Sequence, residues 1–499
     1  LPITLLNHCI IPSVLLGFTH VGYHPLPVLS RKNPTYLNKI CHIFIKSSAG
    51  GISFMPSKHT LVRGAFILTA AGFISRFMGF FFRIFLSHAF GEENVGLYQL
   101  IFPVYALCHS ISTAGIETAL SRTVARKISL SRHREAETAL FIALFFTVSL
   151  SILEIILIQQ NATFIAGHFL GDIRCSEMLV IISYALPCAA VHCCICGYSF
   201  GLQKAEIPAV SQLVEQSVRI AFVVVTFLLI RESGSIPSVS IAAAGIVAGE
   251  FFSLLYSWRV LAKLIRRPAG LSFSALKGPA GELFRLSLPL TANRTAVTLL
   301  QSVEAASIPA SLKLYGMSTP EALSTYGVLT GMALPCILFP SAITSSVGTV
   351  LMPAVTKAQA DGNSSGTAAL IRKAAGSCFL LGIGCCLFFL FTGPYLGNLL
   401  FHSPAAGKFI LTLAWICPFL YTNTALISSI NGLGKTGSTF LINTLSLGIR
   451  IASVFLVIPR YGIVGYLWGL LASQGVVTVL ALCILFILGK KNGSSSIED

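Results

Sequence analysis

Charged residues are scarce in this sequence of 499 residues. Only 10% of them are Asp, Glu, Lys or Arg, whereas 54% are hydrophobic and the mean hydropathy is +0.81. An ordinary soluble domain has about 25% charged residues. The shortage of charge therefore excludes a soluble globular chain and indicates a polytopic membrane protein.

The sequence also lacks the alternation of polar and apolar residues that is typical of a transmembrane β-barrel. Backbone polar groups must be satisfied inside a bilayer, so spanning segments without that alternation must be helices. About 20 apolar residues cross a bilayer core. We therefore predict an all-α polytopic membrane protein with twelve transmembrane helices. They cover residues 64–90, 96–121, 138–159, 177–202, 208–230, 238–262, 283–308, 322–352, 369–393, 407–431, 437–458 and 463–488.

Loops long enough to form a soluble catalytic domain are lacking, and no Ser, His and Asp combination of a hydrolytic site stands out. The cysteines do not point to a metal. Their densest group, "HCCIC" at residues 192–196, lies in a predicted helix, where this spacing cannot direct four ligands to one ion. Small apolar filler is the simpler interpretation. We expect no enzyme activity, no metal site and no cofactor.

A nucleotide-binding loop is absent as well, although "SINGLGKTGS" at residues 429–438 resembles one. A Walker loop has Gly, four further residues and then Gly-Lys-Ser/Thr, because its amides wrap the phosphates at a helix N-terminus. Ser429 stands where the first glycine is required. We interpret the segment as a short turn between two spans.

This turn has a second copy in the chain. Residues 201–223 align without a gap on residues 432–454, and the alignment pairs Arg219 with Arg450. We call the constant spacing between paired positions, such as 219 and 450, the repeat offset. Spans four and five thus correspond to spans ten and eleven. Because each half then holds six spans, an even number, both halves enter the membrane from the same side as parallel repeats.

The repeat defines the predicted organisation. Residues 55–265 form a first six-helix bundle, residues 266–282 a Gly-, Pro- and Ser-rich cytoplasmic linker, and residues 283–491 a second six-helix bundle. Residues 492–499 form a cytoplasmic tail. The first methionine is Met55, and residues 1–54 contain no sustained apolar span, so we interpret them as an extension outside the fold.

Cations outnumber acids by 34 to 18 and gather in alternate connections. Connections rich in Lys and Arg stay on the cytoplasmic side, which predicts that both termini are cytoplasmic. This topology, with attraction to anionic membrane lipids, accounts for the basic excess. We expect no nucleic-acid binding, because there is no soluble basic domain. The connections with most cations are 122–134 and 263–277.

Several ionisable residues lie inside predicted spans, where a charge is expensive without a partner or water. Arg76 and Arg83, seven residues apart, share one face of the first span. Arg294 and Gln301 form a comparable stripe in the seventh span, with Glu304 on its flank. Snorkelling toward the membrane surface is the alternative for Arg83. We predict that these side chains line a cavity.

The fifth span carries Glu215 four residues before Arg219, so the two can pair. They are candidate binding residues, with a purely structural pair as the alternative. Glu250 in the sixth span is equally compatible with a proton or cation site and with a hydrogen-bonded structural acid. Arginines inside a membrane favour an anionic ligand, and a diphosphate suits the guanidinium fork.

Four segments together resemble the stage V sporulation protein B group of polysaccharide transporters. This group belongs to the multidrug/oligosaccharidyl-lipid/polysaccharide flippase superfamily. The segments are "LTAAGFISRFMGFFFRIFLSHAFGEENVGLYQL" (68–100), "GIETALSRTVAR" (115–126), "YSFGLQKAEIPAVSQLVEQSVRI" (198–220) and "INGLGKTG" (430–437).

The resemblance implies a flippase of the bacterial plasma membrane that moves an undecaprenyl-diphosphate-linked sugar by alternating access, in spore cortex or cell-wall polysaccharide synthesis. We expect the chain to be a monomer. It implies that Arg76 and Arg83 contact the diphosphate. Transport would be driven by membrane potential or by a coupling ion, proton or sodium. Two alternatives stay open: proton- or sodium-coupled multidrug efflux, and a polytopic glycosyltransferase, for which the large catalytic loop is missing.

Overall fold

A computed structural model describes residues 58–265, 273–362 and 364–494. The chain divides into two units, Leu1–Ser57 and Lys58–Asp499, and all described residues belong to the second. The predicted extension 1–54 and most of the predicted tail lie outside the described residues, as does the first part of the linker. The described residues are almost entirely helical and contain no strand, which confirms the predicted all-α class.

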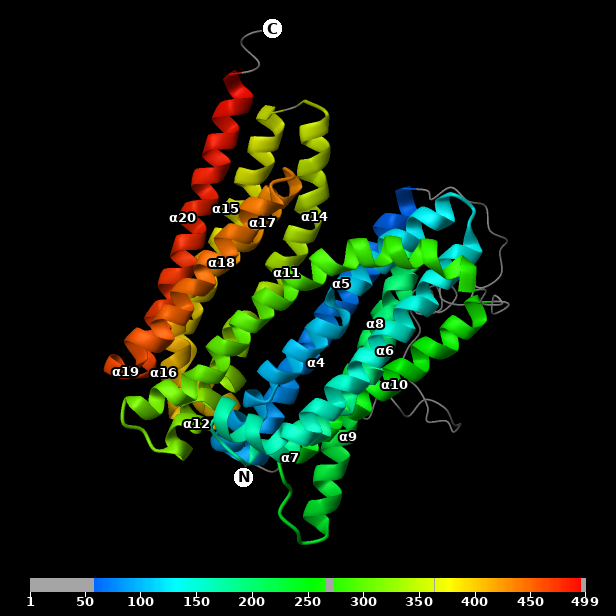
Figure 1. Cartoon of the computed structure of the whole chain (residues 1–499). Helices are drawn as coiled ribbons and strands as arrows, with labels where there is room; N and C mark the ends of the chain where they lie inside the picture. Colours follow the sequence, from blue (N-terminus) through cyan, green and yellow to red (C-terminus); the bar gives the residue numbers. More distant parts are fainter. Residues whose placement is uncertain (1–57, 266–272, 363, 495–499) are drawn as a thin grey trace, which may run out of the picture. The chain divides into compact units, whose positions relative to one another are not determined.

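The helices follow one another along the chain in two sets (Figure 1). The first set is α4 (Lys58–Leu100), α5 (Phe102–Ser129), α6 (His133–Phe164), η1 (Ile165–Phe169), α7 (Cys175–Ser183), α8 (Ala185–Gly201), α9 (Glu206–Glu232) and α10 (Ser240–Leu264). The second set is α11 (Phe273–Leu314), α12 (Thr319–Gly327), η2 (Val328–Ala333), α13 (Leu334–Leu338), α14 (Ser341–Ala360), α15 (Ser364–Phe401), α16 (Pro404–Leu413), η3 (Ala414–Ile416), α17 (Cys417–Gly432), α18 (Thr436–Ala452), η4 (Ser453–Val457), α19 (Ile458–Tyr461) and α20 (Ile463–Ser494).

Within the described residues, ten segments are long and apolar enough to cross a membrane. The first, Phe66–Ser129, contains two of the predicted spans, and the ten omit only the predicted span 283–308, which lies in α11. That part of α11 falls short because it carries the polar stripe of Arg294 and Gln301. The predicted connection at 91–94 is also much shorter than expected. Two helices of α4 meet directly at Gly91, which has a non-helical backbone with a φ of 76° that suits glycine.

The backbone repeats itself between the two sets. Residues with positive φ recur at the repeat offset in three turns, so the internal repeat extends beyond the aligned segment. The turn at Gly434 is one of them, and it joins α17 to α18 as predicted. The three pairs are Ser131 with Gly362, Gly171 with His402, and Gln203 with Gly434.

The two sets meet around a pair of equivalent glycines. A Cβ on Gly96 would overlap the carbonyl oxygen of Leu323, and a Cβ on Gly327 would overlap that of Glu92. Positions 96 and 327 are separated by the repeat offset, and so are positions 92 and 323, so the contact is the same from either side. A two-fold axis between parallel repeats produces such a contact.

Further contacts cross between the sets: α11 packs along α5, and α4 packs on α12 and η2. Ser302 of α11 donates to the Pro103 carbonyl at 2.7 Å, and the ring of Phe80 in α4 lies 4.9 Å from that of Phe339. The two sets therefore share an interface to which α4, α5, α11, α12 and η2 all contribute.

The glycine contact generates a stability prediction. Gly96→Ala places a methyl group against a backbone carbonyl that cannot move aside, so we expect a loss of about 1–3 kcal/mol of folding stability. Gly376→Ala, in α15, is the matched control, because nothing lies within 4 Å of the added Cβ. It gains up to about 1 kcal/mol from helix propensity. Thermal unfolding in detergent measures both, and equal melting temperatures would contradict the close contact.

Candidate functional site

Both arginines of α4 reach from the first half to the second. The exposed Arg76 donates from Nη1 to Ser345 Oγ on α14 at 3.2 Å. The partly buried Arg83 donates from Nη1 to the Thr330 carbonyl in η2 at 3.1 Å. Within the described residues neither forms an ion pair with a carboxylate. The two guanidinium groups therefore lie where the halves meet, bonded to neutral oxygens.

The polar stripe of α11 lies on the flank of that helix. Ser302 and Thr295 face α5, while Glu304 faces α18. Arg294 and Gln301 project between these two sides and are exposed. The described residues supply no hydrogen bond between either of them and the other predicted site residues. Arg294 is within electrostatic reach of Glu117 on α5.

Glu215 and Arg219 of α9 form the predicted pair, with Arg219 Nη2 donating to Glu215 Oε1. Both side chains are largely buried. The Nε of Arg219 is buried and has no hydrogen-bond partner. The contact between the two residues is confirmed, and a role in ligand binding stays a prediction. Their pairing offsets the charge that Arg219 brings near Arg83.

The second half holds its own arginine pair. Arg450 donates from Nε to Glu304 Oε1 at 2.7 Å and from Nη2 to Glu304 Oε2 at 2.5 Å, and Tyr466 donates to Glu304 Oε1 at 2.7 Å. Glu304 is 2% exposed. Sequence reasoning aligned Arg450 with Arg219 but did not include it in the site. The alignment was the available signal, because a repeated arginine needs a carboxylate in each half.

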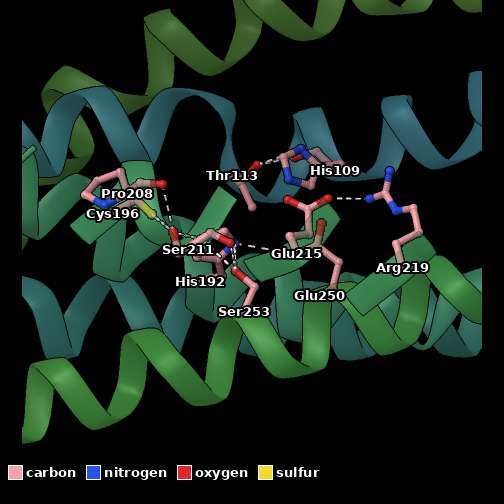
Figure 2. A network of polar contacts seen from close by, with 10 residues as sticks. All are labelled: His109, Thr113, His192, Cys196, Pro208, Ser211, Glu215, Arg219, Glu250 and Ser253. Carbon is pink, nitrogen blue, oxygen red and sulfur yellow. Dashed lines mark hydrogen bonds and ion pairs between the residues drawn. The ribbon is translucent and has the colours of Figure 1, made fainter. Parts of the chain in front are cut away.

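A polar cluster lies inside the first half, among α5, α8, α9 and α10 (Figure 2). Sequence reasoning named its Glu215, Arg219 and Glu250. It missed the other members, because the helices that carry them meet only after folding. The further members are His109, Thr113, His192, Cys196, Ser211 and Ser253.

His192 is the centre of this cluster. Its Nδ1 lies 3.5 Å from Glu250 Oε2, and its Nε2 lies 2.9 Å from Ser211 Oγ and 3.1 Å from Ser253 Oγ. Glu250 is 8% exposed, and its Oε2 accepts no hydrogen bond. The neighbouring α5 contributes His109, whose Nδ1 lies 3.1 Å from Thr113 Oγ1. The cluster thus contains a buried carboxyl that is incompletely satisfied, next to an imidazole.

Among the described residues, no group of three or more His, Cys, Asp or Glu side chains is arranged to hold a metal ion. A pocket of about 590 Å³ opens beside Glu93, Gly316 and Ser324, and none of the predicted site residues lines it. Its rim adjoins a charge cluster in the connection between η1 and α7.

In that connection Asp172 accepts from the backbone N and the side chain of Arg174, with Arg174 Nη2 at 2.8 Å from Asp172 Oδ2. Arg174 also lies 2.8 Å from Glu93 of α4. Burial acts to raise the pKa of Asp172, but the bonds from Arg174 outweigh it and lower the pKa below its usual value. The two carboxylates in turn raise the pKa of Arg174.

Comparison with known proteins places these features in context. Residues 61–359 match the family described as "Polysaccharide biosynthesis protein". The chain is 29% identical to stage V sporulation protein B of Bacillus subtilis (strain 168), over 85% of this chain and 83% of that protein. It is 24% identical to the lipid II flippase MurJ of the same organism, over 62% of this chain and 60% of that protein. The predicted resemblance is confirmed.

Solved structures share the fold. A structure of lipid II flippase MurJ in an inward closed conformation matches with a TM-score of 0.67, over 84% of this chain and 87% of that one. An inward-facing multidrug resistance MATE family transporter of the MOP superfamily matches with a TM-score of 0.66, over 87% and 99%. Both are 14% identical to this chain, so the likeness concerns the fold alone.

The Asp172 cluster predicts a pH-dependent contribution to stability. A carboxylate whose pKa is lowered by folding stabilises the fold above its unfolded pKa of about 3.9, and this contribution is lost as the pH falls through the folded value. Asp172→Asn should cost about 1 kcal/mol at pH 7, since Arg174 is half exposed. The difference from the unsubstituted chain should shrink below pH ~4. Melting temperatures across pH measure this, and a constant difference would contradict it.

Proposed function

Because the chain belongs to the polysaccharide biosynthesis protein family, we propose that it is a flippase for lipid-linked sugars rather than an enzyme. Its relatives include a protein named lipid II flippase and a protein named for stage V of sporulation. The cargo we propose is an undecaprenyl-diphosphate-linked sugar used in spore cortex or cell-wall polysaccharide synthesis. Its headgroup would pass between the two halves while its tail stays among the membrane lipids.

One observation carries this proposal: the arginines that lie where the halves meet are bonded to neutral oxygens. Arg76 bonds to the Ser345 hydroxyl and Arg83 to the Thr330 carbonyl. A phosphate oxygen forms a stronger, charge-assisted hydrogen bond with a guanidinium than a hydroxyl does. A diphosphate can therefore displace these acceptors. If each of these arginines were paired with a carboxylate, as Arg450 is with Glu304, a diphosphate could not displace the partner so easily.

The second half supplies the complementary side chains. Arg294 is exposed on the first helix of that half, as Arg76 is on the first helix of the other. Gln301, two turns further along the same flank, is placed to bond the sugar. We assign Glu215 and Arg219 to the edge of the site. Their pairing reduces the repulsion between Arg219 and Arg83, so that Arg83 remains available for the diphosphate.

Alternating access follows from the symmetric contact between the halves. The backbones approach closely and symmetrically at Gly96 and Gly327, so we propose that the halves rock about this point. The cation-rich connections 122–134 and 263–277 would lie in the cytoplasm with both termini. We propose a monomer, with a coupling ion or the membrane potential as the drive.

Multidrug efflux is the alternative, since a MATE family transporter shares the fold. Cationic drugs require acids that are free to pair with them. Glu215 is already paired with Arg219, and Glu250 faces His192. The arginines would repel a cation, so the flippase is the better account of this chain.

The test of the flippase uses Arg76→Ala combined with Arg294→Ala. Each charge-assisted hydrogen bond contributes about 1.5–3 kcal/mol, so binding of undecaprenyl diphosphate should weaken by at least about 100-fold and flipping in liposomes should stop. Arg372→Ala, an exposed arginine of α15, is the matched control and should leave both unchanged. Full flipping by the double variant, or tighter binding of cationic dyes than of the diphosphate, would overturn the proposal.

A further inference from the structure

In each half, a pair of polar side chains connects the fourth spanning helix to the last one, and we call this pair the bridge. The bridge is ionisable in the first half and neutral in the second. His192 of α8 and Asn423 of α17 are separated by the repeat offset. His192 faces Glu250 of α10, and Asn423 bonds to Gln474 of α20. An ionisable pair in the first half thus stands where the second half has a neutral amide pair.

The equivalence of Glu250 and Gln474 rests on the packing of the last helix of each half. Gly245 of α10 lies against α9, where a Cβ would overlap Val223, and a Cβ on Gly469 of α20 would likewise overlap Ser453. Glu250 and Gln474 each follow this glycine by five residues. The two side chains, which are similar in size, therefore project from the same place in the two halves.

In the neutral bridge, both polar atoms of the Asn423 side chain are hydrogen-bonded. Asn423 Nδ2 donates to Gln474 O and to Gln474 Oε1, both at 3.0 Å, and Thr478 Oγ1 donates to Asn423 Oδ1 at 2.8 Å. Amides alone can therefore hold the last helix against its neighbours. Holding the helices together does not require an ionisable pair at this position.

The ionisable bridge is less complete. The closest approach of His192 to Glu250 is 3.5 Å, and Glu250 Oε2 is buried without a hydrogen-bond partner. His192 binds Ser211 and Ser253 through its other nitrogen, as Figure 2 shows. One carboxyl oxygen of Glu250 is therefore left without a hydrogen bond, next to an imidazole.

When His192 is neutral and Glu250 is ionised, the cluster carries one net negative charge. Glu215 is cancelled by Arg219, so the charge of the cluster follows the proton shared by His192 and Glu250. Without that proton a buried negative charge remains uncompensated, which is unfavourable in a membrane. The other titratable groups that face the bridge are Tyr105, His109 and Glu117 on α5, Cys188 and Cys196 on α8, and Glu215 and Arg219 on α9.

We propose that His192 and Glu250 form a proton-binding site of the first half, with Asn423 and Gln474 as its non-titrating counterpart in the second. Glu117 lies within electrostatic reach of both His192 and Arg294. Uptake of a proton at the bridge therefore changes the field at the proposed headgroup site. The use of this proton to drive transport rests on the proposed function, whereas the proton site itself does not.

The experiment replaces the His192–Glu250 pair with the Asn and Gln found at the equivalent positions of the second half. Purified full-length chain is titrated with pH in lipid nanodiscs, and infrared difference spectra record the C=O stretch of protonated carboxyls. Glu154 of α6 is also buried, with no hydrogen-bond partner for either carboxyl oxygen, so every variant also carries Glu154→Gln. In that background the chain should show a buried carboxyl band that is lost on adding Glu250→Gln, alone or together with His192→Asn as the double variant. The double variant should bind about one proton fewer per chain across the titration.

Glu232→Gln, an exposed acid at the end of α9, is the control and should retain the band. Retention of the band in the double variant would overturn the proposal. Failure of the double variant to fold would overturn it too, because the ionisable pair would then be needed for packing. No lipid-linked sugar enters this titration, so a negative result leaves the flippase standing, and loss of the flippase leaves the proton site standing.

Discussion

A charged side chain inside a membrane is stable only with a partner or water. In this chain, the positions of the carboxylates determine which arginines form ion pairs. Glu215 pairs with Arg219 and Glu304 with Arg450, so these two arginines stabilise their own halves. The arginines that lie between the halves form no such ion pair within the described residues. Their hydrogen-bonding capacity is left for a ligand, and a guanidinium selects an anion. The nature of the proposed cargo follows from this distribution of acids.

The backbone features of the two halves repeat, whereas the charged side chains that we assign to function differ between them. Equivalent glycines meet at the axis, and equivalent turns carry positive φ in both halves. The repeated arginines nevertheless use different acids: Arg219 uses one on its own helix, and Arg450 uses one from α11. The bridge between α8 and α10 is ionisable, while that between α17 and α20 is neutral. In the proposed proton site, the first half titrates while the second holds the corresponding helices together with neutral amides.

Hydropathy was sufficient to predict the helical class and most spans, because the bilayer imposes both length and composition. The repeat was visible from residues 201–223 and 432–454, and the Glu215–Arg219 pair from its spacing of four. Contacts between distant helices were not predictable. Glu304 and Arg450 are far apart in the chain, and which faces meet depends on rotations of helices that hydropathy does not fix. His192 was hidden for the same reason, since a neighbourhood of cysteines suggested only apolar filler.

The most direct test of the account is a cryo-EM map of the purified chain with undecaprenyl diphosphate. The account predicts phosphate density within hydrogen-bonding distance of the Arg76 and Arg294 guanidinium groups, with the bond from Arg76 to Ser345 broken. Density for the diphosphate elsewhere, with Arg76 still bonded to Ser345 and Arg294 turned toward the acyl chains, would contradict it.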